Sequence, residues 1–198
     1  MWDNYRSTFP KRYITPGFFD EYLENCLRQR HPKTILDIGG GTEGTAALQE
    51  IGVPTYLLDP FVKGKPDWIT EKVPWDTTLT FDAVVARGSI NYLTKEELLR
   101  TQEMLNPGGT FIANTFLNPP PEEWGERPYQ NSLGHTGIER SRYNPSTSSI
   151  EHVLIPSKGE PIEHSFFYYS PEEYRALFPR ITLTTYKGNS VILTWTKP

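Results

Sequence analysis

Hydrophobic and polar positions along the chain switch between the period of an amphipathic helix and the short apolar runs of buried strands. Residues 17–30 place apolar side chains at helical spacing, and Pro16 suits the first turn of that helix. Residues 34–39 form an apolar run that ends in glycines, which is typical of a buried strand leading into a loop. A short helix at 45–52 and a second strand at 54–60 complete the first part of the pattern.

The middle of the chain continues the alternation less evenly. Strand signal is weak at 68–70, whereas 81–88 predicts a strong buried strand. Thr94 and Glu97 have capping-box spacing, and they open a helix that runs to Met104 and ends at the turn sequence NPGG. The regular exchange of strands and helices favours a parallel sheet with right-handed crossovers.

Two features interrupt this regular order. Residues 110–117 predict a further strand, but fewer than a dozen residues connect Asp59 to Trp68, which is short for a parallel crossover. We therefore expect a helix to be missing there and the third strand to be trimmed or displaced. Residues 118–149 are rich in Pro, Gly, Ser and Asn without an apolar period, so we expect a structureless, mobile lid that becomes ordered over its ligands.

The remainder predicts hairpins and one more helix. Residues 149–156 and 161–169 read as a β-hairpin, and 170–178 as a capped helix. A second hairpin closes the chain. The expected fold is α/β: a Rossmann-like, mostly parallel sheet with an antiparallel C-terminal strand, plus a loop and β-hairpin lid inserted after the fifth strand. We expect one domain with four parts, namely an N-terminal helical cap (1–32), a cofactor-binding core (33–117), the lid and hairpin (118–169) and the C-terminal helix and hairpin (170–198).

Composition narrows the class of partner. The 198 residues carry a net charge of -4, which disfavours nucleic acid and anionic membrane surfaces as partners. Cys26 is the one cysteine, so a disulfide framework is excluded and a reducing compartment is expected. No apolar run has the ~20 residues that cross a bilayer, and the N-terminus lacks the pattern of a signal peptide. The sequence predicts a cytoplasmic protein without a membrane association, and it leaves the oligomeric state open.

The segment ILDIGGGTEG carries the clearest chemical signal. Gly39, Gly41 and Gly44 satisfy the spacing G-x-G-x-x-G between a strand and a helix, and Asp59 ends the next strand 20 residues after Gly39. On that pattern alone, a site for a dinucleotide and a site for a cationic ligand fit equally well. Asp37 separates the two interpretations, because its negative charge would repel a pyrophosphate but attract a ligand with sulfonium and ammonium groups.

These residues resemble the first motif of the class I S-adenosylmethionine-dependent methyltransferases, which reads apolar, apolar, acidic, apolar, Gly, any residue, Gly, as in Ile35, Leu36, Asp37, Ile38, Gly39, Gly40 and Gly41. FDAVVARG and LNPGGTFIANTF are similar to the family's fourth and fifth strands, and the closing hairpin is similar to its antiparallel sixth and seventh strands. The family commonly has a third small residue in the loop where Glu43 stands here, so we expect the loop to bend one residue later, at Gly44.

The resemblance implies that S-adenosylmethionine is the cofactor. The family's glycine loop, here Gly39, Gly40 and Gly41, holds the methionine part, and an acidic residue at the position of Asp59 holds the ribose. Other candidates for the cofactor site are Pro60, Phe61, Thr70 and Glu71 at the adenine, Arg87 at the carboxyl end of the fourth strand, and Tyr13 closing over the cofactor. Three structural alternatives stay open: Asp37 as a cap of a tight turn, Asp59 as turn chemistry, and Arg87 as a surface ion pair.

A general base is needed only if the methyl acceptor arrives protonated. His135, His164 and Glu139 are the candidates, each with a structural role as the alternative, and the spacing of His, Cys and carboxylates predicts no metal site. Aromatic residues at 166–169 are candidates to line a pocket for a flat acceptor. The predicted function is methyl transfer to a small-molecule acceptor. The alternatives are transfer to a protein, peptide or nucleic acid, non-catalytic cofactor binding, and, with the poorest fit to Asp37, a nicotinamide-dependent oxidoreductase.

Overall fold

The computed structural model describes residues 18–41, 44, 46–130 and 136–198. Two compact units divide them: Asn118–Tyr169 form the smaller one, and the other described residues form the larger one. The N-terminal aromatic residues, including Tyr13, lie outside the described residues, as does His135.

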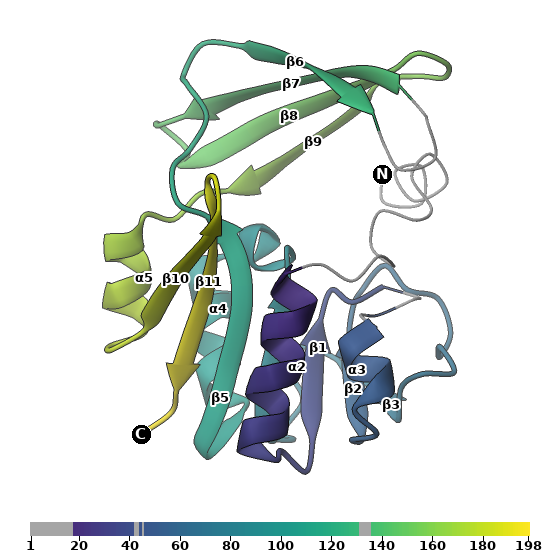
Figure 1. The fold of residues 1–198 in the computed structure, drawn as a ribbon, viewed down its shortest axis with the longest axis vertical. Helices are drawn as coiled ribbons and strands as arrows, with labels where there is room; N and C mark the ends of the chain where they lie inside the picture. The colour runs from purple at the N-terminus through teal and green to yellow at the C-terminus, as the bar shows by residue number, and fades with distance from the viewer. Residues whose placement is uncertain (1–17, 42–43, 45, 131–135) are drawn as a thin grey trace. The chain divides into compact units, whose positions relative to one another are not determined.

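A seven-stranded sheet is the centre of the larger unit (Figure 1). Its strand order is β10-β11-β5-β4-β1-β2-β3, in which the four pairs among β1 to β5 are parallel and β11 is antiparallel to both β5 and β10. This confirms the predicted Rossmann-like sheet with an antiparallel C-terminal strand. The bounds are β1 Ile35–Ile38, β2 Thr55–Leu58, β3 Glu71–Lys72, β4 Phe81–Arg87, β5 Leu105–Phe116, β10 Thr182–Lys187 and β11 Ser190–Thr196.

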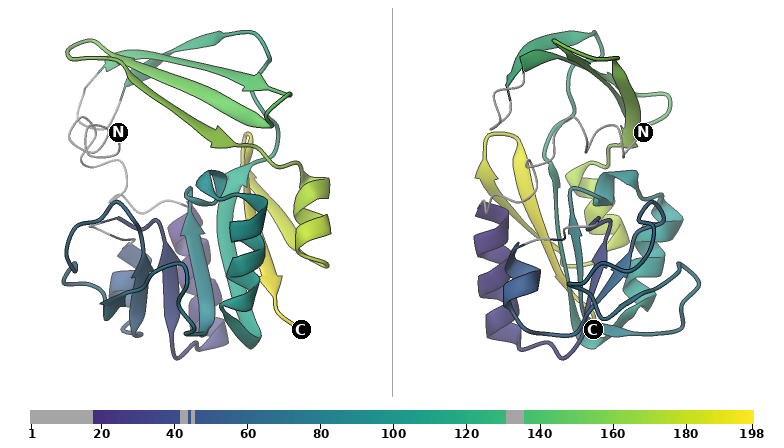
Figure 2. Two further views of the ribbon diagram at one scale, coloured as in Figure 1. Left: turned by 180° about the vertical axis from the view of Figure 1, so that it is seen from behind. Right: turned by 90° about the vertical axis from the view of Figure 1, so that its right-hand side faces the viewer.

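Helices cover both faces of this sheet, with α2 and α3 on one face and α4 and α5 on the other (Figure 2). Their bounds are α2 Phe18–Arg30, α3 Ala46–Glu50, α4 Lys95–Glu103 and α5 Pro171–Leu177, with a 3-10 turn η1 at Ile90–Tyr92. Both predicted capping boxes are present, at Thr94 for α4 and Ser170 for α5. Each supplies side-chain partners for backbone groups that a helix start leaves unsatisfied.

The core follows from the apolar stripe on α2. Leu23 and Leu27 are fully buried against Ile35 of β1, together with residues of α3, β4, β5 and β11. On the other face, the rings of Phe111 and Phe178 stack with centroids 5.1 Å apart. Such aromatic pairs contribute to stability beyond the area they bury.

The sheet has a topological switch point beside β1. The chain runs from β1 outward through β2 and β3, and then returns to β4 on the other side of β1. Ligands of open α/β sheets bind outside the carboxyl ends of the strands at such a point. Asp37 lies near the carboxyl end of β1, paired with Leu57 of β2 and Val85 of β4.

Two expectations for the larger unit were wrong in detail. The third strand is the two-residue β3 rather than 68–70, although the missing helix is confirmed, because residues 59–70 contain none. The sequence NPGG lies within β5 rather than ahead of a strand at 110. There it forms an irregularity in which Phe81 pairs with Leu105 while Ala83 pairs with Thr110. Extra residues opposite a regular strand make a bulge, and glycine tolerates the backbone that this requires.

The smaller unit is a four-stranded antiparallel sheet in the order β6-β7-β8-β9 (Figure 1). Its strands are β6 Gly125–Gln130, β7 Thr136–Asn144, β8 Ser149–Pro156 and β9 Ile162–Phe167. The hairpin predicted at 149–156 and 161–169 is confirmed as β8 and β9. The structureless lid predicted at 118–149 was wrong, because β6 and β7 lie in that segment and extend the hairpin to a four-stranded sheet.

Among the described residues, no helix has both the length and the apolar character to span a membrane.

Candidate cofactor site

The glycine loop after β1 packs directly on two side chains. Gly39 has a φ of +73°, and a Cβ there would lie 2.5 Å from the Cβ of Ser89. A Cβ on Gly40 would lie 1.9 Å from Oδ2 of Asp37. Neither position has room for a larger residue, so the loop is held in van der Waals contact with the Asp37 carboxyl.

Asp59 joins this loop to the end of β2. Its Oδ2 accepts a hydrogen bond from the Gly41 amide at 3.0 Å, and its Oδ1 accepts one from the Phe61 amide at 2.9 Å. The side chain is 5% exposed. The turn role that the sequence left open is therefore present, since Asp59 orders its own turn as well as the glycine loop.

Asp37 is the most unusual group in the larger unit. It is fully buried, and neither carboxyl oxygen has a hydrogen-bond partner among the described residues. Burial, with a contribution from the negative charge of Asp59, raises the pKa of Asp37 to about 7, while the Arg87 guanidinium acts in the opposite direction. The turn-capping alternative for Asp37 finds no support in these contacts. A buried acid without a partner is costly in a folded protein, and such groups cluster at functional sites.

Arg87 ends β4 and forms an ion pair with Asp20, at 3.0 Å between Nη2 and Oδ2. Asp20 is 3% exposed and lies in the first turn of α2. The pair is therefore largely buried rather than a surface pair. Sequence reasoning missed Asp20, because an acidic residue in a first helical turn is ordinary capping chemistry. It also missed Ser89, whose hydroxyl donates to the Ile38 carbonyl beside the glycine loop.

The predicted adenine residues are brought together only in part. Pro60 and Phe61 follow Asp59 directly, and the Phe61 side chain is 63% exposed. Thr70 and Glu71, however, are level with Thr55 and Tyr56 near the start of β2, because the Thr70 amide donates to the Thr55 carbonyl and Glu71 pairs with Tyr56. The residues level with the carboxyl end of β2 instead follow β3, beginning at Val73, whose amide donates to the Leu57 carbonyl. The displaced third strand explains why Thr70 and Glu71 lie level with the start of β2.

The predicted base candidates do not belong to the larger unit. Glu139 lies on β7 and His164 on β9 of the smaller sheet, and Tyr13 and His135 are outside the described residues. The smaller sheet also holds His152 on β8, which sequence reasoning did not single out. Its signal was the repeated triplet IEH, which occurs at Ile150 and again at Ile162.

Comparison with known proteins agrees with this geometry. A family model described as a methyltransferase domain matches residues 11–184. No curated protein matches the chain in sequence.

Solved structures show the same fold at low sequence identity. The CcbJ methyltransferase of Streptomyces caelestis has a TM-score of 0.65 at 13% identity, over 92% of this chain and 97% of that one. An S-adenosylmethionine-dependent methyltransferase of Clostridium acetobutylicum ATCC 824 has a TM-score of 0.66 at 12% identity, over 99% and 97% of the two chains. The 1,6-didemethyltoxoflavin-N1-methyltransferase of Burkholderia thailandensis has a TM-score of 0.54 at 17% identity, over 98% and 86%.

The family model covers most of the chain, and the unpartnered Asp37 beside the glycine loop is suited to a cationic cofactor. The chain therefore belongs to the methyltransferase-domain family, and it has the fold of the solved S-adenosylmethionine-dependent methyltransferases.

Proposed function

We propose that this protein transfers a methyl group from S-adenosylmethionine to a small-molecule acceptor. The observation that carries the cofactor assignment is the fully buried, unpartnered carboxyl of Asp37 under the glycine loop. An ammonium group would supply the hydrogen-bond donors and the positive charge that this carboxyl lacks. A pyrophosphate would supply neither. The residues present therefore fit the methionine part of the cofactor.

The roles of the other residues follow from their contacts. Asp59, whose orientation is fixed by the Gly41 and Phe61 amides, would accept hydrogen bonds from the ribose hydroxyls. Phe61, exposed directly after Asp59, offers a ring to the adenine. Arg87, held by Asp20, would balance the negative charge that gathers at this edge of the sheet. When bound, the cofactor supplies a methyl carbon that its sulfonium sulfur activates toward in-line attack by a nucleophile. The protein's task is then to orient the reactants and exclude water.

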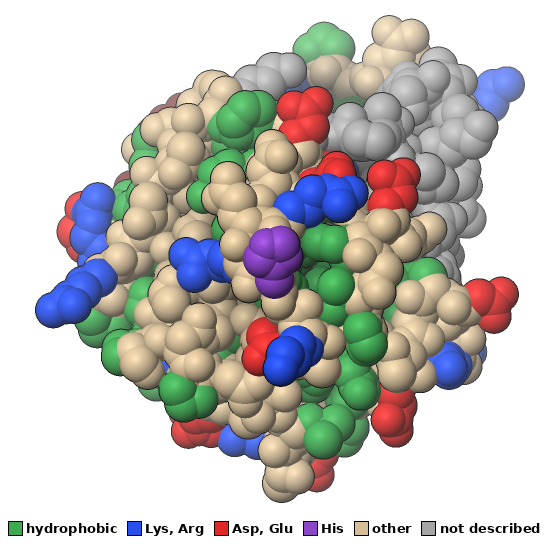
Figure 3. Space-filling model, turned by 60° about the horizontal axis from the view of Figure 1, so that its bottom comes forward, with side chains coloured by type: hydrophobic (Ala, Val, Ile, Leu, Met, Phe, Trp, Pro, Cys, Tyr) green, Lys and Arg blue, Asp and Glu red, His purple; other side chains and the backbone are tan. Residues whose placement is uncertain are grey.

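A small acceptor is supported by charge and by a relative. The net charge of -4 gives no general attraction to a polyanion. The face in Figure 3 carries Lys and Arg side chains interspersed with Asp and Glu rather than a basic patch. The relative from Burkholderia thailandensis was solved with 1,6-didemethyltoxoflavin and S-adenosylhomocysteine bound. A protein or peptide acceptor remains the alternative.

Calorimetry tests the cofactor assignment. We expect S-adenosylmethionine and S-adenosylhomocysteine to bind and NAD not to bind. Tight NAD binding without binding of either adenosyl compound would refute the assignment.

A labelling experiment tests the acceptor class. The protein is incubated with methyl-labelled S-adenosylmethionine and a cell extract that ultrafiltration has split into small-molecule and macromolecular fractions. We expect label to be transferred in the small-molecule fraction. Transfer confined to the macromolecular fraction would favour a protein or peptide acceptor, and cofactor binding without transfer in either fraction would indicate a non-catalytic binding protein.

A further inference from the structure

The indole of Trp68 packs against the far end of the glycine loop. Gly44, at that end, is buried and has a φ of +63°. A Cβ on Gly44 would lie 2.8 Å from Cε2 and Cζ2 of Trp68 and 2.9 Å from its Cη2. These three atoms belong to the six-membered ring of the indole, which is rigid and cannot bend aside as the end of a flexible side chain can. Gly44 is therefore packed so closely on this ring that no side chain fits between them.

The near end of the loop is fixed by the neighbouring strand. The Gly41 amide donates to Asp59 at the end of β2, at 3.0 Å. At the far end, the Gly44 amide donates to the Gly40 carbonyl at 3.0 Å. That hydrogen bond lies within the loop, so it does not attach Gly44 to the rest of the protein. The contact with Trp68 does.

A small apolar cluster holds Trp68 in place. Val62 and Ile69 are each 4% exposed and form a cluster with Leu57 of β2, and Trp68 packs against this cluster. A crossover between parallel strands usually contains a helix that packs on the sheet, but residues 59–70 contain none. The cluster takes the place of that helix, and it carries Trp68 to the glycine loop.

The glycines make this loop costly to order. Four of the six residues from 39 to 44 are glycines, namely Gly39, Gly40, Gly41 and Gly44. Glycine loses more backbone freedom on ordering than any other residue, and a ligand that has to order such a loop binds more weakly by that cost. A rigid ring that already contacts the loop moves part of this cost from binding to folding. A loop ordered before the ligand arrives therefore binds it more tightly.

We propose that Trp68 is a positioning residue for the cofactor, whose ring holds the far end of the glycine loop in the conformation that receives the methionine part of S-adenosylmethionine. The proposal rests on the proposed function, which assigns the loop and Asp37 to this part of the cofactor. Trp68 acts through Gly44 and leaves the Asp37 carboxyl in place. Loss of its ring should therefore raise the dissociation constant of the cofactor without abolishing binding.

Calorimetry with S-adenosylhomocysteine compares the wild type with two variants. Trp68→Leu keeps an apolar side chain for the cluster but lacks the six-membered ring that meets Gly44, so we expect its dissociation constant to rise about tenfold. Trp68→Phe keeps an aromatic ring and should lose less, about threefold. An unchanged dissociation constant in Trp68→Leu would overturn the proposal. If the wild type itself does not bind the ligand, the proposed function fails, and this proposal fails with it.

A double-mutant cycle separates contact with the loop from a general effect on stability. Gly44→Ala places a methyl group against the ring, in a backbone conformation that also strains alanine, so it should weaken binding in the wild-type background. In Trp68→Leu the ring is gone, and the same change should cost about threefold less affinity than it does in the wild type. Equal costs in the two backgrounds would show that Trp68 does not act through Gly44, and they would overturn the proposal.

Fluorine spectra supply a signature that a merely structural tryptophan would not show. The chain has five tryptophans, and 5-fluorotryptophan carries its label at Cζ3, which is not one of the three ring atoms nearest to Gly44. The Trp68 resonance is the one that Trp68→Phe removes. We expect S-adenosylhomocysteine to shift it, because the ligand contacts the loop that this ring supports. A Trp68 resonance that stays in place at saturation would contradict the proposed role.

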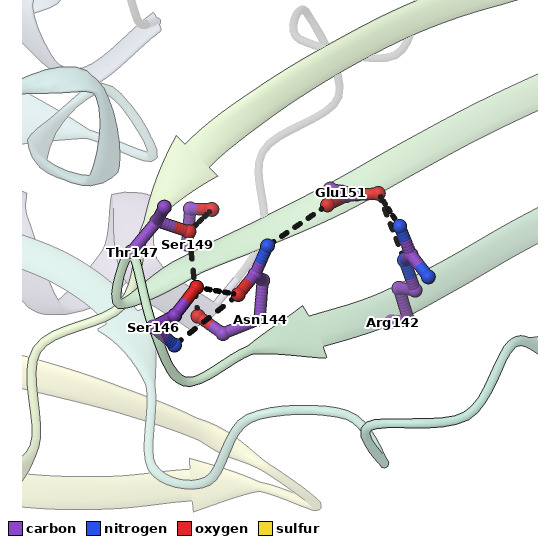
Figure 4. A network of polar contacts seen from close by, with 6 residues as sticks. All are labelled: Arg142, Asn144, Ser146, Thr147, Ser149 and Glu151. Atoms are coloured by element: carbon purple, nitrogen blue, oxygen red, sulfur yellow. Dashed lines mark hydrogen bonds and ion pairs between the residues drawn. The ribbon is translucent and has the colours of Figure 1, made fainter.

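Two other tryptophans report whether each unit of the leucine variant stays folded. Trp195 of β11 is 5% exposed, and its Nε1 donates to the Pro179 carbonyl within the larger unit. In the smaller unit, the guanidinium of Arg142 lies over the ring of Trp124, 4.9 Å from the ring centroid. Glu151 holds that guanidinium in the polar network of Figure 4. Both resonances should keep their wild-type positions in the leucine variant.

Trp195→Phe is the matched control. It removes an indole and its hydrogen bond from β11, and β5 and β4 separate this strand from β1 and its glycine loop. We expect a lower melting temperature but an unchanged dissociation constant. If Trp195→Phe weakened binding as much as Trp68→Leu, lost stability would explain both results and the proposal would fail. If the leucine variant does not fold, Trp68→Phe is compared with Trp195→Phe instead, and equal affinities in these two would overturn the proposal.

Discussion

The pKa of Asp37 is raised by its burial and, after that, by the negative charge of Asp59 at the end of the neighbouring parallel strand. β1 and β2 are in register up to Ile38 and Leu58, and the loop that follows β1 donates its Gly41 amide to Asp59. Two carboxyls are thus held at one edge of the sheet, with a single glycine loop joining them. This arrangement costs stability without a ligand and favours a cation when one is present.

Cofactor affinity should depend on pH through Asp37. Its pKa of about 7 in the free protein means that the carboxyl is largely protonated below pH 7, and an ammonium group binds only the ionised form. We expect the dissociation constant of S-adenosylhomocysteine to rise as pH falls below 7, by up to about tenfold per pH unit. Calorimetry between about pH 5.5 and about pH 8.5, roughly 1.5 units on either side of the Asp37 pKa, measures this loss of affinity. A constant affinity across that range would show that Asp37 does not contact the ligand.

Asp37→Asn should stabilise the protein without its cofactor. A carboxyl whose pKa is raised on folding destabilises the folded protein increasingly as the pH rises from the unfolded pKa of 3.8 to the folded pKa of about 7. The amide avoids this loss, so we expect a higher melting temperature at pH 8, by roughly 2–4 °C for each kcal/mol gained. The gain should shrink as pH falls below 7. Thermal unfolding at several pH values checks it, and cofactor binding should be lost in the same variant.

Asp82→Asn is the matched control, with the opposite sign. The hydrogen bond from the Asn106 side chain, aided by backbone amides, lowers the pKa of Asp82. Stability from such a group is present above the unfolded pKa and is lost as pH falls through the folded one. Asp82→Asn should therefore lower the melting temperature at pH 8. If both variants shift it in the same direction, removal of charge alone would explain the results.

The sequence analysis singled out Asp37, Gly39 and Asp59 because their signals are local. A short apolar run, a glycine loop and an acidic residue at the next strand end are all adjacent in the chain, so Asp37, Gly39 and Asp59 could be placed from pattern alone. Asp20 could not, because its partner Arg87 is distant in the sequence and meets it only when α2 packs on the sheet. The position of Thr70 and Glu71 level with the start of β2 was not visible in the sequence, because a two-residue strand has too few positions to show an alternation.

Asp59→Ala should weaken cofactor binding and also lower the stability of the folded protein. Removing the side chain leaves the Gly41 and Phe61 amides without their acceptor, and it removes a charged acceptor from the ribose. We expect cofactor binding to weaken by about 1–3 kcal/mol, the usual cost of losing such a hydrogen bond. Asp59→Asn, which keeps one side-chain oxygen, should lose less of both. Dissociation constants and unfolding midpoints of the two variants, measured together, separate the two effects. An unchanged affinity in folded Asp59→Ala would place the ribose elsewhere.

Arg87→Gln should raise the pH at which cofactor affinity begins to fall. The guanidinium lowers the pKa of Asp37, so its removal lets that pKa rise further. We expect the fall in affinity to begin at a higher pH than in the wild type. Arg87→Lys keeps the positive charge, so affinity should begin to fall near the same pH as in the wild type. Both variants also disturb the pair with buried Asp20, so the melting temperature should fall in both. If affinity in Arg87→Gln begins to fall at the same pH as in the wild type, the electrostatic effect of Arg87 on Asp37 would be contradicted.

Strands β6 and β7 of the smaller sheet escaped the sequence analysis for a physical reason. β7 has the sequence TGIERSRYN, in which one face presents Glu139 and Ser141 and the other presents Arg140 and Arg142. With polar side chains on both faces, the strand shows no alternation of apolar and polar residues. Ion pairs across the strands, such as Arg140 with Glu126 and Arg142 with Glu151, mark the pairing instead, and they become visible only once the register is known.

The pairing of β7 predicts that this strand resists proteolysis. Arg140 and Arg142 lie in a central strand that is paired with both β6 and β8, so their backbone groups are engaged on both sides. Cleavage requires an extended, accessible backbone, and exposed loop tips are therefore cut first. Lys158 is exposed in the turn between β8 and β9, just before Gly159. We expect trypsin to cut after Lys158 well before it cuts after Arg140 or Arg142, with or without S-adenosylhomocysteine. Mass spectrometry of a digestion time course gives the order of the cuts. Early cleavage after Arg140 and Arg142 that the ligand slows would mean that β7 opens in solution, and a mobile lid would then describe this segment better than a stable sheet.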